Sequence, residues 1–167
     1  MSASKQPKIT LKPKLTDKFL DFVLLLSLAV IAVVTIIGFV ILPTEIPFKY
    51  DNSGNVISYG SKFVLLINPV LAFILAFTLR WLINYPPIFN YSYKITKQNI
   101  EAQYRLAQRL IMAINIVETW LFAYFAIAGL ISAKQQHSVT DMRIAGGFVV
   151  LIFVVIGFYF KRAKALR

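Results

Sequence analysis

Few side chains in this sequence have the type and spacing that catalysis or metal binding requires. The chain has one histidine, His137, and no cysteine, so we expect no zinc site built from protein ligands. It has no Gly-rich phosphate loop, no His-Glu-x-x-His helix and no Gly-x-Ser-x-Gly elbow. His137 follows an apolar stretch and is expected to be an ordinary surface residue of a short loop. We therefore predict that the chain is not an enzyme and has no catalytic residue, cofactor or metal.

The carboxyl group of Glu118 is the most unusual chemical feature, because it interrupts a long apolar stretch. A carboxylate inside a membrane is costly unless it is paired or protonated, and such residues usually face other helices. At about 100° per residue, Glu118 falls within an arc of about 140° on one helix face. Four other polar residues share this arc: Glu101, Arg105, Gln108 and Asn115.

Arg80 and Asn68 are the other polar candidates within apolar stretches. Arg80 is close to the end of its stretch, and we expect its side chain to reach Glu118 as an ion pair. Such a pair either fixes the register of the helices or belongs to a proton or ion site. Asn68 differs from Glu118 by about 10 Å in depth, at about 1.5 Å per helical residue. The sequence therefore supplies no continuous polar path across a membrane.

Four apolar stretches must position these side chains. Hydrophobic residues make up 58% of the chain and charged residues only 15%, whereas soluble domains have about 45–50% and about 25%. As helices, the stretches can cross a hydrocarbon core of about 30 Å. They cover residues 20–42, 63–84, 108–132 and 143–160. We predict an all-α, polytopic membrane domain of four transmembrane helices over residues 19–160, with basic tails at 1–18 and 161–167.

The Lys and Arg residues predict the orientation of the four spans. The segment before the first span, the loop between the second and third spans, and the C-terminal segment hold 14 of the 18 Lys and Arg residues. Because cytoplasmic segments carry such an excess, we place both termini and this loop inside, at the cytoplasmic membrane of a bacterium. The net charge of +11 comes largely from these flanking blocks, so we expect no nucleic acid partner. The first tail, to about residue 16, is either disordered or lies on anionic lipid.

The third span is predicted to continue into the cytoplasm as a helix. Thr96 is a candidate N-cap, and the helix would run from about Lys97. Thr96, Glu101 and Arg105 then form a candidate surface for a cytoplasmic regulator or a membrane partner protein. The alternative is a solvated helix extension, with the lipid bilayer as the partner of the chain. The sequence leaves the oligomeric state open.

The loop between the first two spans, residues 43–62, has strong turn signals. Pro43 ends the first helix, because proline cannot continue the helical hydrogen-bond ladder. The segment 51–55, Asp-Asn-Ser-Gly-Asn, predicts a turn, since Gly and Asn tolerate positive φ. Ser61 is a candidate cap for the second span. The loop is either an ordered connector or an outward surface that contacts a ligand or toxin.

A motif in two parts runs through this loop: LPTEIPFKYDNSG begins at Leu42, and YGSK begins at Tyr59. It resembles the signature of a bacterial membrane family, the domain of unknown function sixteen-forty-eight, which is also found in immunity proteins against the sporulation-delay toxin. The matching residues are Leu42, Pro43, Ile46, Pro47, Gly54, Gly60, Ser61 and Lys62. The resemblance covers about residues 20–130. It implies a small multi-helix membrane protein and no particular reaction.

Two positions depart from the family pattern. Lys49 stands where the family usually has His, and Ile57 stands where it often has Asp. If that His and Asp bind a metal or move a proton, this chain lacks the groups to do so. The resemblance therefore implies no metal for this chain.

Three functions are compatible with these features. The leading hypothesis is a non-enzymatic membrane protein of the immunity-like family, which protects the membrane or senses an outside condition. In this reading Pro47, Lys49 and Gly54 face the stimulus, and residues 96–109 face a cytoplasmic partner. The second is a small proton- or ion-coupled transporter, or a transporter subunit, that uses Glu118. The third is a membrane anchor subunit of a larger complex.

Overall fold

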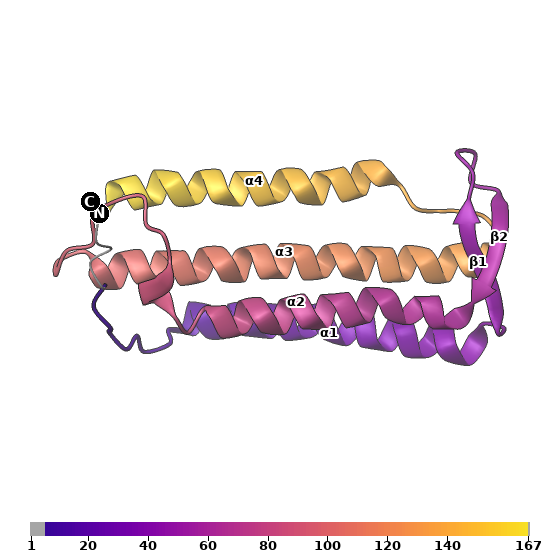
Figure 1. Cartoon of the computed structure of the whole chain (residues 1–167), viewed down its shortest axis with the longest axis horizontal. Coiled ribbons are helices and arrows are strands. Elements are labelled where there is room, and N and C mark those ends of the chain that lie inside the picture. Colours follow the sequence, from indigo (N-terminus) through magenta and orange to yellow (C-terminus); the bar gives the residue numbers. More distant parts are fainter. Residues whose placement is uncertain (1–5, 167) are drawn as a thin grey trace.

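Four long helices run side by side along the long axis of the molecule, as Figure 1 shows for this computed structural model. The structure describes residues 6–166. Within them, the helices are α1 (Leu15–Ile41), α2 (Ile67–Leu82), α3 (Ile100–Gln135) and α4 (Met142–Ala165). A short 3₁₀ helix, η1 (Lys62–Leu66), leads into α2, and a second one, η2 (Pro86–Ile88), follows it. Each of the four long segments is apolar and long enough to cross a membrane when η1 is counted with α2.

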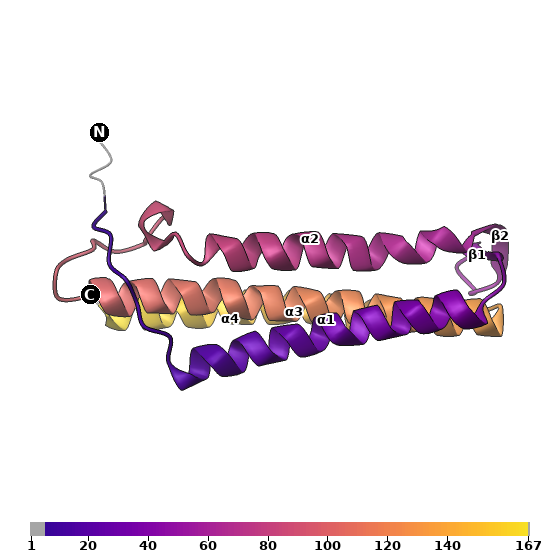
Figure 2. The ribbon, with the colours of Figure 1, turned by 90° about the horizontal axis from the view of Figure 1, so that it is seen from below.

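Helix α3 is the centre of the assembly. It packs against α1, α2 and α4, whereas α4 makes its principal contacts with α3 alone. Figure 1 shows α4 on one side of α3, with α1 and α2 on the other. Figure 2 shows that the N-terminal end of α1 diverges from α3. The helices therefore do not surround one shared core, and α3 has partly open flanks.

Small side chains form the contacts between the helices. Ala72 on α2 and Ala123 on α3 are almost fully buried beside Ile31 on α1, and Ala76 on α2 is buried in a second cluster with Leu28 and Met112. Small residues let helix backbones approach closely, which is how helices associate in lipid. The outward faces carry large apolar side chains instead, among them Phe22, Phe77 and Phe153. Such a surface suits hydrocarbon and would be unusual on a soluble monomer.

The start of α1 and the end of α4 lie at one end of the molecule, and the loop between α1 and α2 lies at the other (Figure 1). We call these the terminal end and the hairpin end. The loop forms an antiparallel hairpin of β1 (Glu45–Tyr50) and β2 (Val56–Ser61). The all-α expectation thus holds for the four spans but misses this small sheet. Two β-prone segments flank the turn at residues 51–55, and this pattern is typical of a hairpin.

Several sequence-derived boundaries need correction. Helix α3 begins at Ile100 and not near Lys97. Thr96 is not its N-cap: the Thr96 N–H donates to Asn99 Oδ1 at 2.8 Å, and the Asn99 N–H donates to Thr96 Oγ1 at 3.3 Å. This reciprocal pair forms a turn ahead of the helix, because both side chains satisfy backbone groups before the helical ladder starts.

The helices also extend into both of the expected basic tails. Helix α1 begins at Leu15, inside the expected tail 1–18, and α4 continues to Ala165, inside the expected tail 161–167. The described part of the first tail is mostly exposed but is attached to α3, since the Tyr104 hydroxyl donates to the Pro7 carbonyl at 2.9 Å. Residues 1–5 and 167 of these tails lie outside the described residues.

Candidate functional site

The hairpin is fastened to the end of α1 by Lys62. The Lys62 ammonium donates to the Phe39 carbonyl at 3.0 Å and lies 5.5 Å from the centre of the Phe39 ring. The Lys62 backbone N–H donates to the Thr44 carbonyl at 2.9 Å. The last carbonyls of a helix have no partner within the helix, and a cation there is stabilised by the helix dipole. Lys62 therefore closes α1, while Ser61 accepts from the Phe63 N–H to begin η1.

The turn of the hairpin is fastened to the connection between α3 and α4. The Ser138 N–H donates to the Gly54 carbonyl at 2.8 Å, and the Tyr59 hydroxyl donates to Gln136 Oε1 at 2.7 Å. Gly54 has a φ of +86°, and a Cβ added there would lie 2.6 Å from the His137 ring. His137 is exposed, as expected, but its ring is packed against Gly54, a role that its surroundings in the sequence do not signal. The hairpin is thus held at both of its ends.

A pocket of about 180 Å³ lies beneath β1, between α1, α2 and α3. Ile46, Pro47 and Phe125 contribute to its mainly apolar lining. Three polar side chains also line it, those of Thr35, Tyr50 and Asn68. The Thr35 hydroxyl donates to the Ile31 carbonyl at 2.8 Å, whereas the Asn68 side chain has no hydrogen-bond partner among residues 6–166. The Asn68 amide is therefore available to a ligand in this pocket, which we call the hairpin pocket.

The remaining motif residues divide into packed and exposed ones. Ile46 and Pro47 are buried against the helix ends, and a Cβ added at Gly60 would meet the Phe48 side chain at 3.4 Å. Helix α1 ends at Ile41, and its C-cap Leu42 is followed directly by Pro43. This helix therefore ends where the sequence predicts. The motif therefore has a structural explanation over most of its length.

The two positions that depart from the family pattern lie next to each other on the hairpin. Lys49 pairs with Ser58 in the sheet register, one residue from Ile57, and both Lys49 and Ile57 are exposed. A lysine ammonium and an alkyl chain at these positions cannot form a pair of metal ligands. Residues 6–166 contain no cluster of three His, Cys, Asp or Glu residues that could hold a metal ion.

Asn115 and Gln108 face α2, as the polar arc of α3 predicts. Asn115 is fully buried and donates from Nδ2 to the Ala76 carbonyl at 3.0 Å. Its Oδ1 is buried and has no partner in the described chain. Gln108 donates to the Ile83 carbonyl at 2.9 Å, one of the free carbonyls at the end of α2. These bonds attach α3 to the backbone of α2.

The expected ion pair between Arg80 and Glu118 is wrong. Arg80 Nε donates instead to Asp21 Oδ1 at 2.8 Å, with Nη2 at 3.3 Å from Oδ2. The two residues lie at different levels along the helices. Arg80 and Asp21 lie towards the terminal end, whereas Glu118 lies about nine residues beyond Arg109 on α3, which is about 14 Å closer to the hairpin end. Glu118 is half-buried and has no hydrogen-bond or ion-pair partner within residues 6–166.

Arg105 belongs to an ion-pair cluster at the terminal end and not to an open partner surface. Its Nη1 lies 3.1 Å from Asp17 Oδ2, and its Nη2 lies 3.1 Å from Glu101 Oε1. Arg109 Nε lies 2.8 Å from the other oxygen of Asp17. The Arg105 side chain is only 11% exposed. Of the three expected partner residues, Thr96 and Glu101 are exposed and Arg105 is buried.

An aromatic and amide layer at the terminal end has no obvious signal in the sequence. The rings of Tyr91 and Tyr104 stack with centroids 5.4 Å apart, and the Tyr91 hydroxyl donates to the Pro86 carbonyl at 3.0 Å. Burial raises the pKa of Tyr91 well above its ordinary value. Gln103 donates to the Ala163 and Leu166 carbonyls, each at 3.1 Å, and thereby caps the end of α4. This layer joins the α2–α3 loop to α4.

Comparisons of the chain with family models, with curated proteins and with solved structures found no match. Two places where a polar group lacks a protein partner involve residues that the sequence singles out. One is Asn68 in the hairpin pocket, and the other is the pair formed by Asn115 and Glu118 in the middle of α3.

Proposed function

We propose that this chain is a non-enzymatic, multi-pass protein of the bacterial cytoplasmic membrane that recognises a membrane-active peptide at its hairpin end. The role is immunity-like or signal-sensing. The observation that carries the proposal is the hairpin pocket, about 180 Å³ in volume and mainly apolar, with the unpartnered Asn68 amide in its lining. Pockets for whole small molecules usually measure about 300–1,000 Å³. A volume below that range suits one apolar side chain of a peptide, with Asn68 available to its backbone.

The attachment of the hairpin supports this reading. Lys62 holds the hairpin to α1, and the bond between Ser138 and Gly54 holds it to the α3–α4 connection. The roof of the pocket is therefore preorganised, and a ligand does not need to order it, which favours binding. The same attachments link the pocket to both outer connections, through which binding would be sensed.

The charge distribution supports an outward position of the hairpin end. Most Lys and Arg residues belong to the termini and the α2–α3 loop, which gather at the terminal end (Figure 1). Trp81 and Tyr85 lie together there, with ring centroids 4.7 Å apart, as aromatic residues do at a membrane interface. The terminal end would then be cytoplasmic, with Thr96 and Glu101 exposed to a regulator.

The resemblance to the domain of unknown function sixteen-forty-eight fits this proposal. Its signature coincides with the hairpin, the roof of the pocket and the lysine that closes α1. In this chain Lys49 would meet the peptide as a cation, because it stands exposed on β1 in place of the family's usual His.

Filling the hairpin pocket tests the proposal. Gly129 lines the pocket, and a Cβ added there would have no neighbour within 4 Å. Gly129→Leu should therefore fill the cavity without distorting α3. Gly157→Leu is the matched control, because Gly157 on α4 has the same open surroundings and lies away from the pocket. The measurements are survival of expressing and deleted cells against a panel of membrane-active peptides, and their transcript levels.

We expect cells with the wild-type chain to differ from deleted cells for at least one peptide. Gly129→Leu should abolish that difference, and Gly157→Leu should preserve it. Equal survival and equal transcription in wild-type and deleted cells would overturn the proposal. So would full activity of Gly129→Leu at wild-type protein levels.

A second candidate, a proton-coupled transporter, is favoured by Glu118 and Asn115. The buried Oδ1 of Asn115 and the Glu118 carboxyl both lack partners in the described chain, and they lie one helical turn apart. A protonated Glu118 could donate a hydrogen bond to Asn115 Oδ1, and it would release its proton to water or to a substrate when the carboxyl group ionises. Proton flux in proteoliposomes that disappears with Glu118→Gln would support this function. An unchanged flux and an unchanged stability of Glu118→Gln would exclude Glu118 as a proton carrier.

A further inference from the structure

A large groove opens along α3 at the terminal end, on a different face from the hairpin pocket. Its volume is about 1,020 Å³, and its walls come from α3, from the C-terminal half of α4 and from the start of α1. Figure 2 shows why it exists: the N-terminal end of α1 diverges from α3. Since α4 packs mainly on α3, the space between α1 and α4 is not filled by another helix.

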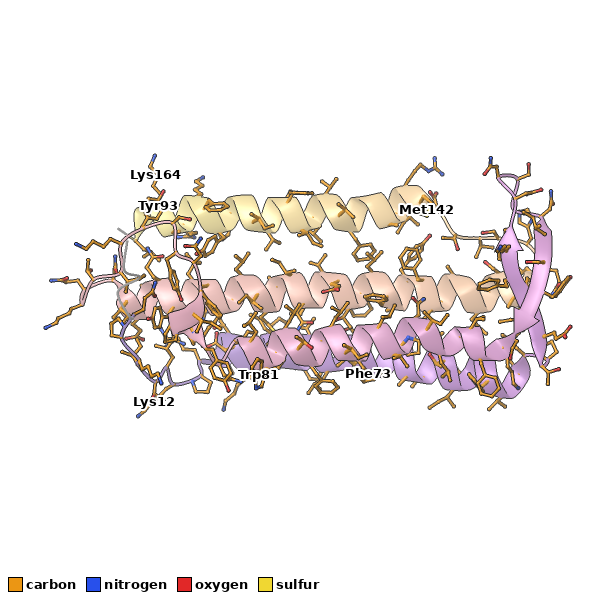
Figure 3. All side chains as sticks on the ribbon, in the orientation of Figure 1. Lys12, Phe73, Trp81, Tyr93, Met142 and Lys164 are labelled. Carbon is orange, nitrogen blue, oxygen red and sulfur yellow. The ribbon has the colours of Figure 1, made fainter. Side chains whose placement is uncertain are left out.

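The walls of this groove change character along its length. Leu110, Ala113 and Val154 make its deeper part apolar. Towards the terminal end its lining becomes cationic, with Lys14, Arg105, Arg109 and Arg162. In Figure 3, Lys164 and Tyr93 lie nearer the tip of the terminal end than Trp81 on α2. The groove therefore runs from the polar interface into the apolar part of the molecule.

Two of the four cations have no carboxylate partner. Arg105 and Arg109 are neutralised by Asp17 and Glu101. Within residues 6–166, Lys14 and Arg162 form no ion pair, and the Arg162 guanidinium lies 5.3 Å from the centre of the Phe158 ring. The ring holds this cation at the mouth of the groove. About two positive charges at the polar end of the groove therefore have no carboxylate to compensate them.

Tyr159 adds a hydrogen-bonding group to the wall. Its side chain is mostly buried and lines the groove, and its hydroxyl has no hydrogen-bond partner in the described chain. The Tyr159 hydroxyl oxygen is not fully enclosed by protein atoms, so it remains accessible from the groove. It can donate to an ester or phosphate oxygen beside Arg162.

We propose that this groove binds one anionic glycerophospholipid, with its phosphate between Lys14 and Arg162 and its acyl chains along Leu110, Ala113 and Val154. Basic pockets between membrane helices bind acidic lipid headgroups in this way. A zwitterionic lipid would leave the two cations only partly compensated. A helix of another protein could fill the apolar part, but it would have to bring acidic residues to the interface.

Native mass spectrometry of the purified full chain tests this assignment, with dioleoyl phosphatidylglycerol and dioleoyl phosphatidylcholine as the probes. We expect one retained phosphatidylglycerol and no equivalent phosphatidylcholine adduct. The double variant Lys14→Gln/Arg162→Gln should weaken binding about five-fold for each cation removed. The control Lys97→Gln/Lys161→Gln removes two exposed cations from the same end, outside the groove lining, and should bind as the wild type does.

A second pair of variants tests the apolar part. Ala113→Trp places a large ring in the groove, whereas Ala29→Trp places the same ring on an exposed position of α1. Only Ala113→Trp should lose the retained lipid. Equal retention of the two lipids, or equal binding by groove and control variants, would overturn the proposal. A wild-type dimer that Ala113→Trp separates would also overturn it, because a second chain would then occupy the groove.

Discussion

Asp17 on α1 and Arg105 on α3 are 88 residues apart in the chain, and their side chains lie 3.1 Å apart at the terminal end. The same carboxylate binds Arg109 through its other oxygen and accepts the Lys14 N–H at 2.8 Å within the first turn of α1. One acidic residue therefore caps α1 and holds the diverging N-terminal end of α1 to α3.

Loss of the Asp17 charge should destabilise the helix assembly. Asp17→Asn keeps an oxygen for the cap but leaves the Arg105 guanidinium, 11% exposed, without its main counter-charge. Breaking a fully buried ion pair costs about 3–5 kcal/mol. Because Asp17 is 25% exposed, we expect a smaller loss of about 2–3 kcal/mol. Thermal unfolding in detergent measures it.

Asp21→Asn is the matched control for this prediction. It breaks the Asp21–Arg80 pair, whose side chains are 37% and 41% exposed. Exposed pairs contribute about 0–1 kcal/mol, so Asp21→Asn should change stability much less than Asp17→Asn. Equal losses for the two variants would contradict the central place we give to Asp17.

Gly54→Ala should loosen the hairpin. Gly54 has a φ of +86°, and a Cβ there would lie 2.6 Å from the His137 ring. An L-residue in this backbone region costs about 1–3 kcal/mol. Gly60→Ala, whose Cβ would make an ordinary contact with Phe48 at 3.4 Å, is the control. Amide hydrogen exchange of the hairpin should accelerate only in Gly54→Ala, and adding His137→Ala should restore part of the protection.

The turn of the hairpin should be sensitive to acid. Hydrogen bonds from the Asn55 N–H, the Asn55 side chain and the Ser53 N–H hold the pKa of Asp51 below its ordinary value of 3.8. Because this pKa is lower in the folded state than in the unfolded state, ionised Asp51 stabilises the turn at neutral pH. That contribution is lost as the pH falls through the lowered pKa. Amide exchange at Ser53 and Asn55 should accelerate in that window.

Asp51→Asn provides the comparison for the acid effect. The Asn side chain accepts hydrogen bonds without titrating. Amide exchange at the turn should therefore not accelerate as the pH falls below 3.8, the ordinary pKa of Asp. An acid window that persists in Asp51→Asn would assign the effect to another group.

Replacing Glu118 should not weaken the assembly. Its carboxyl group has no partner among residues 6–166, and a charge at mid-span costs about 2.5–3.5 kcal/mol on insertion scales. We expect Glu118→Leu to raise stability by about 1–2 kcal/mol, part of that cost. Asn115→Leu, which removes the bond to the Ala76 carbonyl, should instead lower stability by about 1 kcal/mol. A large loss in Glu118→Leu would reveal a partner for this carboxyl group.

Cysteine labelling should reveal the orientation of the chain, since the natural sequence has no cysteine. Ser53 in the hairpin turn and Ser92 in the α2–α3 loop are both exposed. A membrane-impermeant maleimide should label Ser53→Cys in intact cells and Ser92→Cys only after permeabilisation. The opposite pattern would invert the proposed topology and place the hairpin pocket in the cytoplasm.

Local features of the sequence determined much of the fold. Apolar runs of about 20 residues are sufficient to predict four spans. Pro43 ends the first helix and residues 51–55 form a turn with Gly54 at positive φ, as their types predict. These features depend on neighbouring residues alone, so that they can be recognised before any tertiary contact is known.

Tertiary structure decided which groups meet. Arg80 forms an ion pair with Asp21 and not with Glu118. Arg105 is buried in an ion pair with Asp17 and is not exposed to a partner protein. Both outcomes depend on the depths at which neighbouring helices lie beside each other, which hydropathy does not encode. The groove along α3 likewise arises from the divergence of α1 and from the placement of α4, although each of its lining residues looks ordinary in the sequence.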